Sequence, residues 1–183
     1  RDASNVEDMG YMFRYSKVPS VSIGDAGKVK DMGYMFEGSQ IEKVEIGNTS
    51  SVTSMINMFA NAEKLKEGNF SDWDTSKVKT MRAMLQNTKA LESPVNFRDA
   101  SNVEDMGLMF RNSKVPSVNI GDAGKVKDMA YMFENSWIKK VEIRNTSSVT
   151  SMLNMFAAAT ELKEGNFSDW DTSKVKTMRA MFH

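Results

Sequence analysis

The chain of 183 residues contains no cysteine, a single histidine, three prolines and no formal net charge. Without cysteine it can form neither a disulfide nor a Cys-ligated zinc site. Because His183 is the one histidine, the usual nucleophilic triads and histidine-based metal sites cannot be assembled. A phosphate-binding glycine motif is missing as well. We therefore expect a protein that is not an enzyme and that needs no cofactor.

The charge balance and the hydropathy pattern narrow the range of partners. The 24 basic residues are matched by 24 acidic ones, whereas nucleic-acid binders normally show a basic excess or a basic stripe. No apolar run approaches the roughly 20 residues of a membrane span. We expect no nucleic-acid partner and no membrane insertion in this segment. The chain begins and ends within a repeat, so we expect it to be a piece of a longer protein.

The abundant residue is methionine, with 16 copies, and every copy falls in one recurring pattern. The pattern reads Val-x-x-Met-x-x-Met-Phe and occurs eight times. Its valines are Val6, Val29, Val52, Val78, Val103, Val126, Val149 and Val175. Shifting the chain by 97 residues aligns residues 1–86 with 98–183, and only 14 of those 86 positions differ. We interpret the chain as a single solenoid over 1–183, made of two near-identical blocks, 1–97 and a truncated 98–183.

Two elements are expected in each repeat. The apolar spacing i, i+3, i+6, i+7 predicts one stripe of a short α-helix, with Ser or Gly two residues before each Val as its N-cap. Glu7 and Glu104 stand where a capping box needs them. An apolar alternation five or six residues after the Phe, as in Val18, Val21 and Ile23, predicts a strand. Around Leu91, Pro94, Val95 and Phe97 we expect a bulge or a weak strand.

One strand and one helix per 23–26 residues, always in the same order, predict the fold class. We expect an α/β, leucine-rich-repeat-like solenoid of eight repeats, each with one short parallel strand and one short helix. A single unit is too small to fold alone, so neighbouring repeats have to cover its flanks.

The motifs themselves resemble a known family. Asp-Thr-Ser-Lys-Val-Lys-Thr-Met-Arg-Ala-Met at 74–84 and Trp-Asp-Thr-Ser at 73–76 and 170–173 are similar to BspA-type leucine-rich-repeat-like modules of bacterial surface proteins. The resemblance covers essentially the whole chain, although its units are shortened and Leu85 replaces the usual Phe. It implies an extracellular or cell-surface location and, for many members, adhesion. It supplies no catalytic residues.

Two side-chain columns have both a structural and a chemical interpretation. The Met-x-x-Met ladder could hold Cu(I), but methionines that share a stripe with Val and Phe favour core packing. A second column lies two residues before the expected N-caps and consists of Asp2, Asp25, Asn48, Asp74, Asp99, Asp122, Asn145 and Asp171. It suggests either calcium between turns or a series of Asx-turns, and the Asn replacements favour the turns.

The candidate partner-binding residues are three tryptophans and two charged pairs. Trp73 and Trp170 follow a strand, where we expect them to cover the core edge; exposed, they would serve as binding anchors. Trp137 replaces Gln40 where the blocks diverge. Outward strand positions, among them Lys43, Glu45, Lys140 and Glu142, predict a polar face without a row of aromatic side chains. That face either binds a protein or carries solvated cross-strand ion pairs.

Two functions follow as hypotheses. The first is a non-enzymatic bacterial surface solenoid that mediates protein–protein interaction or adhesion to a host or matrix protein. The second is a structural spacer, or a module that assembles end to end by head-to-tail self-association into a fibre. The near-identity of the two blocks favours the second.

Overall fold

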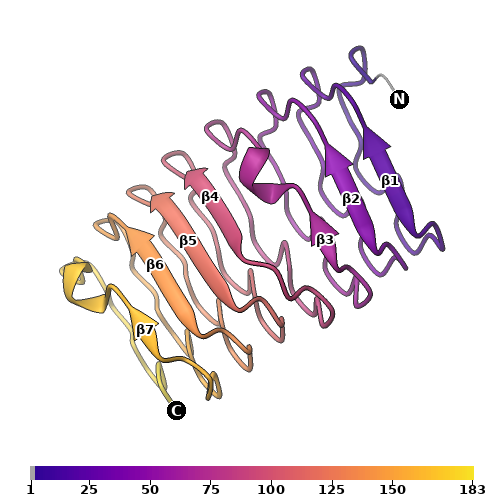
Figure 1. Ribbon diagram of the computed structural model, residues 1–183. Coiled ribbons are helices and arrows are strands. Elements are labelled where there is room, and N and C mark those ends of the chain that lie inside the picture. The colour runs from indigo at the N-terminus through magenta and orange to yellow at the C-terminus, as the bar shows by residue number, and fades with distance from the viewer. Residues whose placement is uncertain (1–2) are drawn as a thin grey trace.

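The computed structural model describes residues 3–183, which form a parallel β-solenoid of about six turns. Seven strands lie side by side in chain order, with β1 near the N-terminal end and β7 near the C-terminal end (Figure 1). The elements are β1 Ser20–Ile23, β2 Lys43–Ile46, β3 Glu67–Gly68, η1 Phe70–Asp72, β4 Val95–Asp99, β5 Ser117–Asp122, β6 Lys140–Arg144, β7 Glu164–Gly165 and η2 Phe167–Asp169. The expectation of a solenoid is confirmed.

The strands form two parallel sheets, β1–β2–β3 and β4–β5–β6–β7. Neighbouring strands are in register, so Val21 lies beside Val44, and Val118 beside Val141. Apolar side chains point inward and polar ones outward, as the period of two predicts. β3 and β7 are only two residues long, and each is followed by a single 3₁₀ turn.

The bulge or weak strand expected near Pro94 is not found. β4 runs for five residues and pairs with β5 from Val95 onward. Pro94 precedes the strand, so its missing N–H removes no ladder hydrogen bond. The register shift lies instead between Ile120 and Asp122 in β5. At the intervening Gly121, a Cβ would stand 2.0 Å from the carbonyl oxygen of Arg98, so only glycine allows β4 and β5 to approach so closely.

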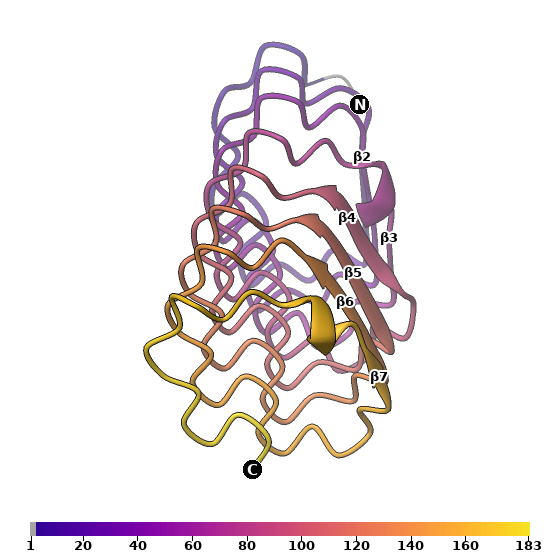
Figure 2. The same ribbon diagram turned by 90° about the vertical axis from the view of Figure 1, so that its left-hand side faces the viewer.

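The methionine segments are not helices, and the prediction of one helix in each of eight repeats is wrong. Residues 3–183 contain no α-helix, and the side of the solenoid away from the strands consists of successive turns (Figure 2). Alternate amides donate to the next coil, as from Met9 to Asp31 O (2.9 Å). The amides between them donate three residues back, as from Met12 to Met9 O (3.3 Å). No amide is left for the i−4 bonds of a helix.

The expected helix caps have other roles in the structure. The amides of Gly27, Ser76 and Ser101 donate to the Asp side chains two residues earlier and do not begin helices. Glu7 pairs with Lys30 of the following coil, and Glu104 pairs with Lys127, so neither closes a capping box.

The turns depend on residues with positive φ. Sixteen non-glycine residues within the described part of the chain have φ between 48° and 63°. Fourteen of them lie two residues after the first Met or two after the Phe of a repeat (Leu85 in one repeat), as at Leu108 (63°) and Asn112 (55°). This left-handed conformation interrupts a helix. Eight of the sixteen are asparagines, the side chain that tolerates it best after glycine.

The core runs along the whole coil. The Val, Met, Met and Phe of the interior repeats are completely buried, as Val29, Met32, Met35 and Phe36 show. The phenylalanine rings of successive coils stack with centroids 5.1–5.4 Å apart, and Leu85 interrupts this stack between the blocks. The core-packing interpretation of the methionines is therefore confirmed.

Candidate binding surface

The described aspartates of the Asp/Asn column form Asx-turns, as the structural interpretation predicted, whereas Asn48 and Asn145 accept the hydroxyl groups of Ser50 and Ser147. Oδ1 of Asp25 accepts the Gly27 amide (2.8 Å) and Nδ2 of Asn48 (2.8 Å). Asp122 makes the same contacts with Gly124 and Asn145 (2.9 and 2.7 Å). Each carboxylate thus closes its own corner and binds the next coil. Asp2 lies outside the described residues.

Trp73 and Trp170 lie at the edge of the core and are not surface anchors. Trp73 is 5% exposed and packs against Phe59 and Phe70. Its Nε1 donates to Oδ1 of Asn69 (3.1 Å). Trp170 is half-buried and contacts Asn166 in the same way (3.3 Å).

Asn69 and Asn166 have a role that the sequence analysis did not assign to them. The Asn69 side chain accepts the Ile46 amide (3.1 Å) and donates to the Ile46 carbonyl (3.0 Å). Asn166 does the same at Ile143 (3.0 and 2.8 Å). Each side-chain amide thus makes the hydrogen bonds that a peptide group of the next strand would make, at a point where the short strand β3 or β7 has already ended.

Trp137 is the exposed tryptophan of the three, at 45%. It precedes β6 and lines a hollow with Pro116, Lys114 and Lys139. Because Lys140 and Glu142 follow within β6, the structure brings these three candidate residues to one region of the surface. Trp73 and Trp170 do not join them.

The charged candidates form ion pairs on the outer face of the sheets. Nζ of Lys43 lies 3.3 Å from Glu45 and 3.5 Å from Glu67 of the next strand. Hydrogen bonding to Glu45, together with both negative charges, raises the pKa of Lys43. Lys140 pairs in the same way with Glu142 (3.0 Å) and Glu164 (3.8 Å), and its pKa is raised for the same reason. Such exposed pairs contribute little to stability.

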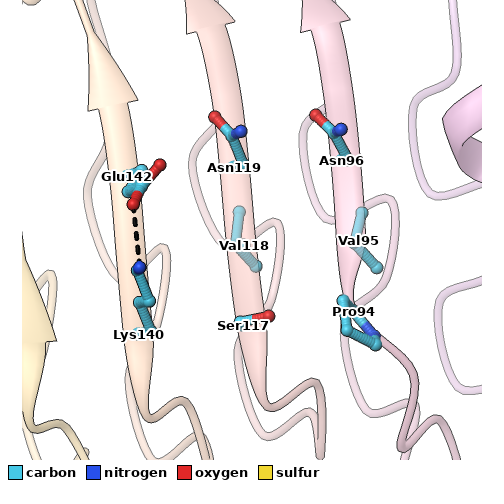
Figure 3. A pocket seen from close by; sticks show the side chains of 8 residues that line it. All are labelled: Pro94, Val95, Asn96, Ser117, Val118, Asn119, Lys140 and Glu142. Atoms are coloured by element: carbon cyan, nitrogen blue, oxygen red, sulfur yellow. Dashed lines mark ion pairs between the residues drawn. The ribbon is translucent and has the colours of Figure 1, made fainter.

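A trough runs along β5 between β4 and β6 (Figure 3). Its floor is low because the outward side chains of β5, Ser117 and Asn119, are short. Pro94 and Asn96 flank it on β4, and the Lys140–Glu142 pair flanks it on β6. The hollow measures about 260 Å³. Lys140 and Glu142 are the sequence-derived candidates that line it, and Lys43 and Glu45 lie away from it in the other sheet.

The titratable groups of the surface are arranged for pairing. Hydrogen bonds from Lys30, Lys66 and Lys127 lower the pKa values of Glu7, Glu42 and Glu104 respectively, which keeps these carboxyl groups ionised.

No set of three or more His, Cys, Asp or Glu side chains converges on a metal-sized site among residues 3–183. In the same part of the chain no helix is long and apolar enough to cross a bilayer.

These features define a class of protein: a tandem-repeat parallel β-solenoid with a polar, grooved sheet face. The chain belongs to the DUF285 family, described as Mycoplasma protein of unknown function, which it matches over residues 1–47, 19–123 and 117–183. No curated protein and no solved structure matches the chain.

Proposed function

We propose that this chain is a non-enzymatic binding solenoid that receives a protein partner on the outer face of β4, β5 and β6. The observation that carries the proposal is the trough along β5, with short side chains on its floor and charged side chains on its β6 wall. Solenoids commonly bind proteins along such extended surfaces. The neighbouring Trp137 provides the large, exposed aromatic side chain that is typical of interface anchors.

The resemblance to BspA-type surface repeats supports an extracellular or cell-surface location for this binding. In that setting the partner is a host or matrix protein, and the solenoid displays the trough on a rigid rod. The outward positions of the sheets carry no row of aromatic side chains among residues 3–183, which disfavours a nucleic acid as the partner.

The duplication supplies a matched test. Ser117→Trp fills the trough, whereas Ser20→Trp places the same side chain at the equivalent position of the first block. Binding of both variants to immobilised matrix and cell-surface proteins is measured by interferometry. We expect Ser117→Trp to abolish the binding seen with the natural chain and Ser20→Trp to preserve it. Equal binding by all three chains would show that the trough is not the binding surface.

A second candidate, a structural module that stacks end to end, rests on the junction between the blocks. There Nη1 of Arg82 lies 3.3 Å from Asp105 and 3.3 Å from Asp128 in the two following coils. In the duplicated pattern, Arg82 corresponds to Arg179 in the last coil, and Asp105 and Asp128 correspond to Asp8 and Asp31 in the first two coils. None of Arg179, Asp8 and Asp31 forms an ion pair within residues 3–183. Met12 and Phe182 at the two ends are 59% and 63% exposed.

Stacking predicts linear oligomers that grow with concentration in analytical ultracentrifugation. Arg179→Glu would weaken them, because it places a negative charge opposite Asp8 and Asp31 of the next copy. Lys64→Glu makes the same charge change at an exposed side chain of a repeat away from both ends, and would not weaken the oligomers. A monomer at every concentration excludes this function for the chain.

A further inference from the structure

The trough continues beyond Asn96 and Asn119 into a second hollow of about 220 Å³. Arg98 on β4 and Arg144 on β6 flank this end, and Gly121 on β5 lies between them without a side chain. The two hollows share both asparagines, so they form one continuous surface feature along β5. The arginine end is positive, while the Lys140–Glu142 end is internally neutralised.

Arg98 and Arg144 are exposed, and neither guanidinium group forms an ion pair or a hydrogen bond with any residue of 3–183. Arg14, Arg82 and Arg111 contrast with them, because each of these is held by carboxylates of neighbouring coils. The two free guanidinium groups therefore keep all their donors available for a ligand.

The acidic side chains beside this end have other partners. Glu142, two residues before Arg144, pairs with Lys140 (3.0 Å). Oδ1 of Asp99 accepts the Ser101 amide (2.8 Å), and Oδ1 of Asp122 accepts the Gly124 amide (2.9 Å). Both carboxylates thus close backbone corners. The arrangement occurs in one block only, since Gly47 stands where Arg144 would be in the first block.

We propose that Arg98 and Arg144 bind a carboxylate side chain of an extended acidic peptide segment that lies along β5. This assignment rests on the proposed binding function and names the chemistry of its partner. Guanidinium groups match carboxylates through paired hydrogen bonds. The amides of Asn96 and Asn119 both donate and accept, as a peptide backbone requires. β5 spans about 20 Å, the length of about six extended residues.

Other anionic ligands fit the trough less well. A sugar chain would have no aromatic ring to stack on, because none of the side chains that line the two hollows is aromatic. A free phosphate would use the arginine end and leave the rest of the trough empty.

Fluorescence anisotropy tests the proposal with a labelled peptide of about six residues that carries Glu at alternate positions, and with its Gln counterpart. We expect the Glu peptide to bind, and the Gln peptide to bind about tenfold or more weakly. The double substitution Arg98→Gln and Arg144→Gln would cost a similar factor for the Glu peptide. Lys64→Gln removes one positive charge from an exposed side chain outside the trough, and would leave binding unchanged.

Three results would overturn the proposal: equal binding of the two peptides, unchanged binding by the double variant, or an equal loss in Lys64→Gln. Binding of a sulfated oligosaccharide or inorganic phosphate that depends on both arginines, without binding of the Glu peptide, would also overturn it. If Ser117→Trp abolishes binding of a matrix protein while the double arginine variant retains it, the acidic-peptide assignment fails and the binding function stands.

Discussion

At the scale of single residues, the turns of the solenoid depend on residues held at positive φ. Left-handed backbone costs a residue other than glycine about 1–2 kcal/mol, and the cost is greater for Ala, Leu or Tyr than for Asn. Ala158 has φ +54° and stands where the first block has Asn61, also at positive φ. The two blocks thus meet the same backbone requirement with side chains of different suitability.

Ala158→Gly should therefore stabilise the protein by about 0.5–1 kcal/mol, because glycine adopts this conformation without strain. The neighbouring Ala159 is not among the residues with positive φ. Ala159→Gly should thus destabilise the protein by a similar amount. Urea denaturation of the two variants measures both effects, and a loss of stability in Ala158→Gly would contradict the assigned turn.

The Asx-turns make stability dependent on pH. Hydrogen bonds from the hydroxyl and amide of Ser76 lower the pKa of Asp74 below its ordinary value. A lowered folded-state pKa means that this contribution is complete above the unfolded pKa of about 3.9 and is lost as pH falls through the folded value. We expect Asp74→Asn to reduce the loss of thermal stability between neutral pH and strongly acidic pH. Asp72→Asn, which removes an exposed acid outside the column, serves as the control. Parallel pH profiles for the natural chain and Asp74→Asn would refute the assignment.

At the scale of elements, the turns are joined by a ladder of asparagine side chains. Nδ2 of Asn87 donates to Asn61 (2.6 Å), that of Asn112 to Asn87 (2.8 Å), and that of Asn135 to Asn112 (2.8 Å). The ladder spans both the interruption between the two sheets, from β3 to β4, and the boundary between the blocks, which lies within β4. Asparagine meets two needs here, since it tolerates positive φ and bonds to both neighbours.

Asn112→Ala should cost about 2–3 kcal/mol, because it removes two hydrogen bonds and leaves alanine at positive φ. Asn119→Ala, on the outer face of β5, should change the free energy of unfolding by less than about 0.5 kcal/mol. Denaturation curves measure the free energy of unfolding of both variants. Equal losses would show that the asparagine ladder does not stabilise the protein.

The strands were predictable because alternating burial has a period of two, and β1, β2 and β6 follow it. The helices were wrongly predicted because successive turns place apolar side chains inward at spacings of three and four, as a helix does. Gly10, Gly33 and Gly107 within the motif, and its repeated asparagines, were the overlooked signals of turns. The trough was not predictable, because Arg98 and Arg144 lie 46 residues apart in the sequence and meet only through the register of three coils.

At the scale of the whole molecule, the contribution of a side chain to stability depends on whether neighbouring coils cover it on both sides. Met81 is completely buried between the blocks, whereas Met178, its equivalent in the last coil, is 42% exposed. Met81→Ala should cost about 2–5 kcal/mol, as a buried cavity does, and Met178→Ala should cost less than about 1 kcal/mol. Similar costs in calorimetry would mean that the last coil is covered in solution and would favour end-to-end stacking.

The methionine segments are turns of a β-solenoid and not helices. Far-UV circular dichroism of the 183-residue chain tests this assignment. We expect a β-type spectrum without the paired minima of an α-helix. A strong helical signal, as expected from one helix in each repeat, would contradict it.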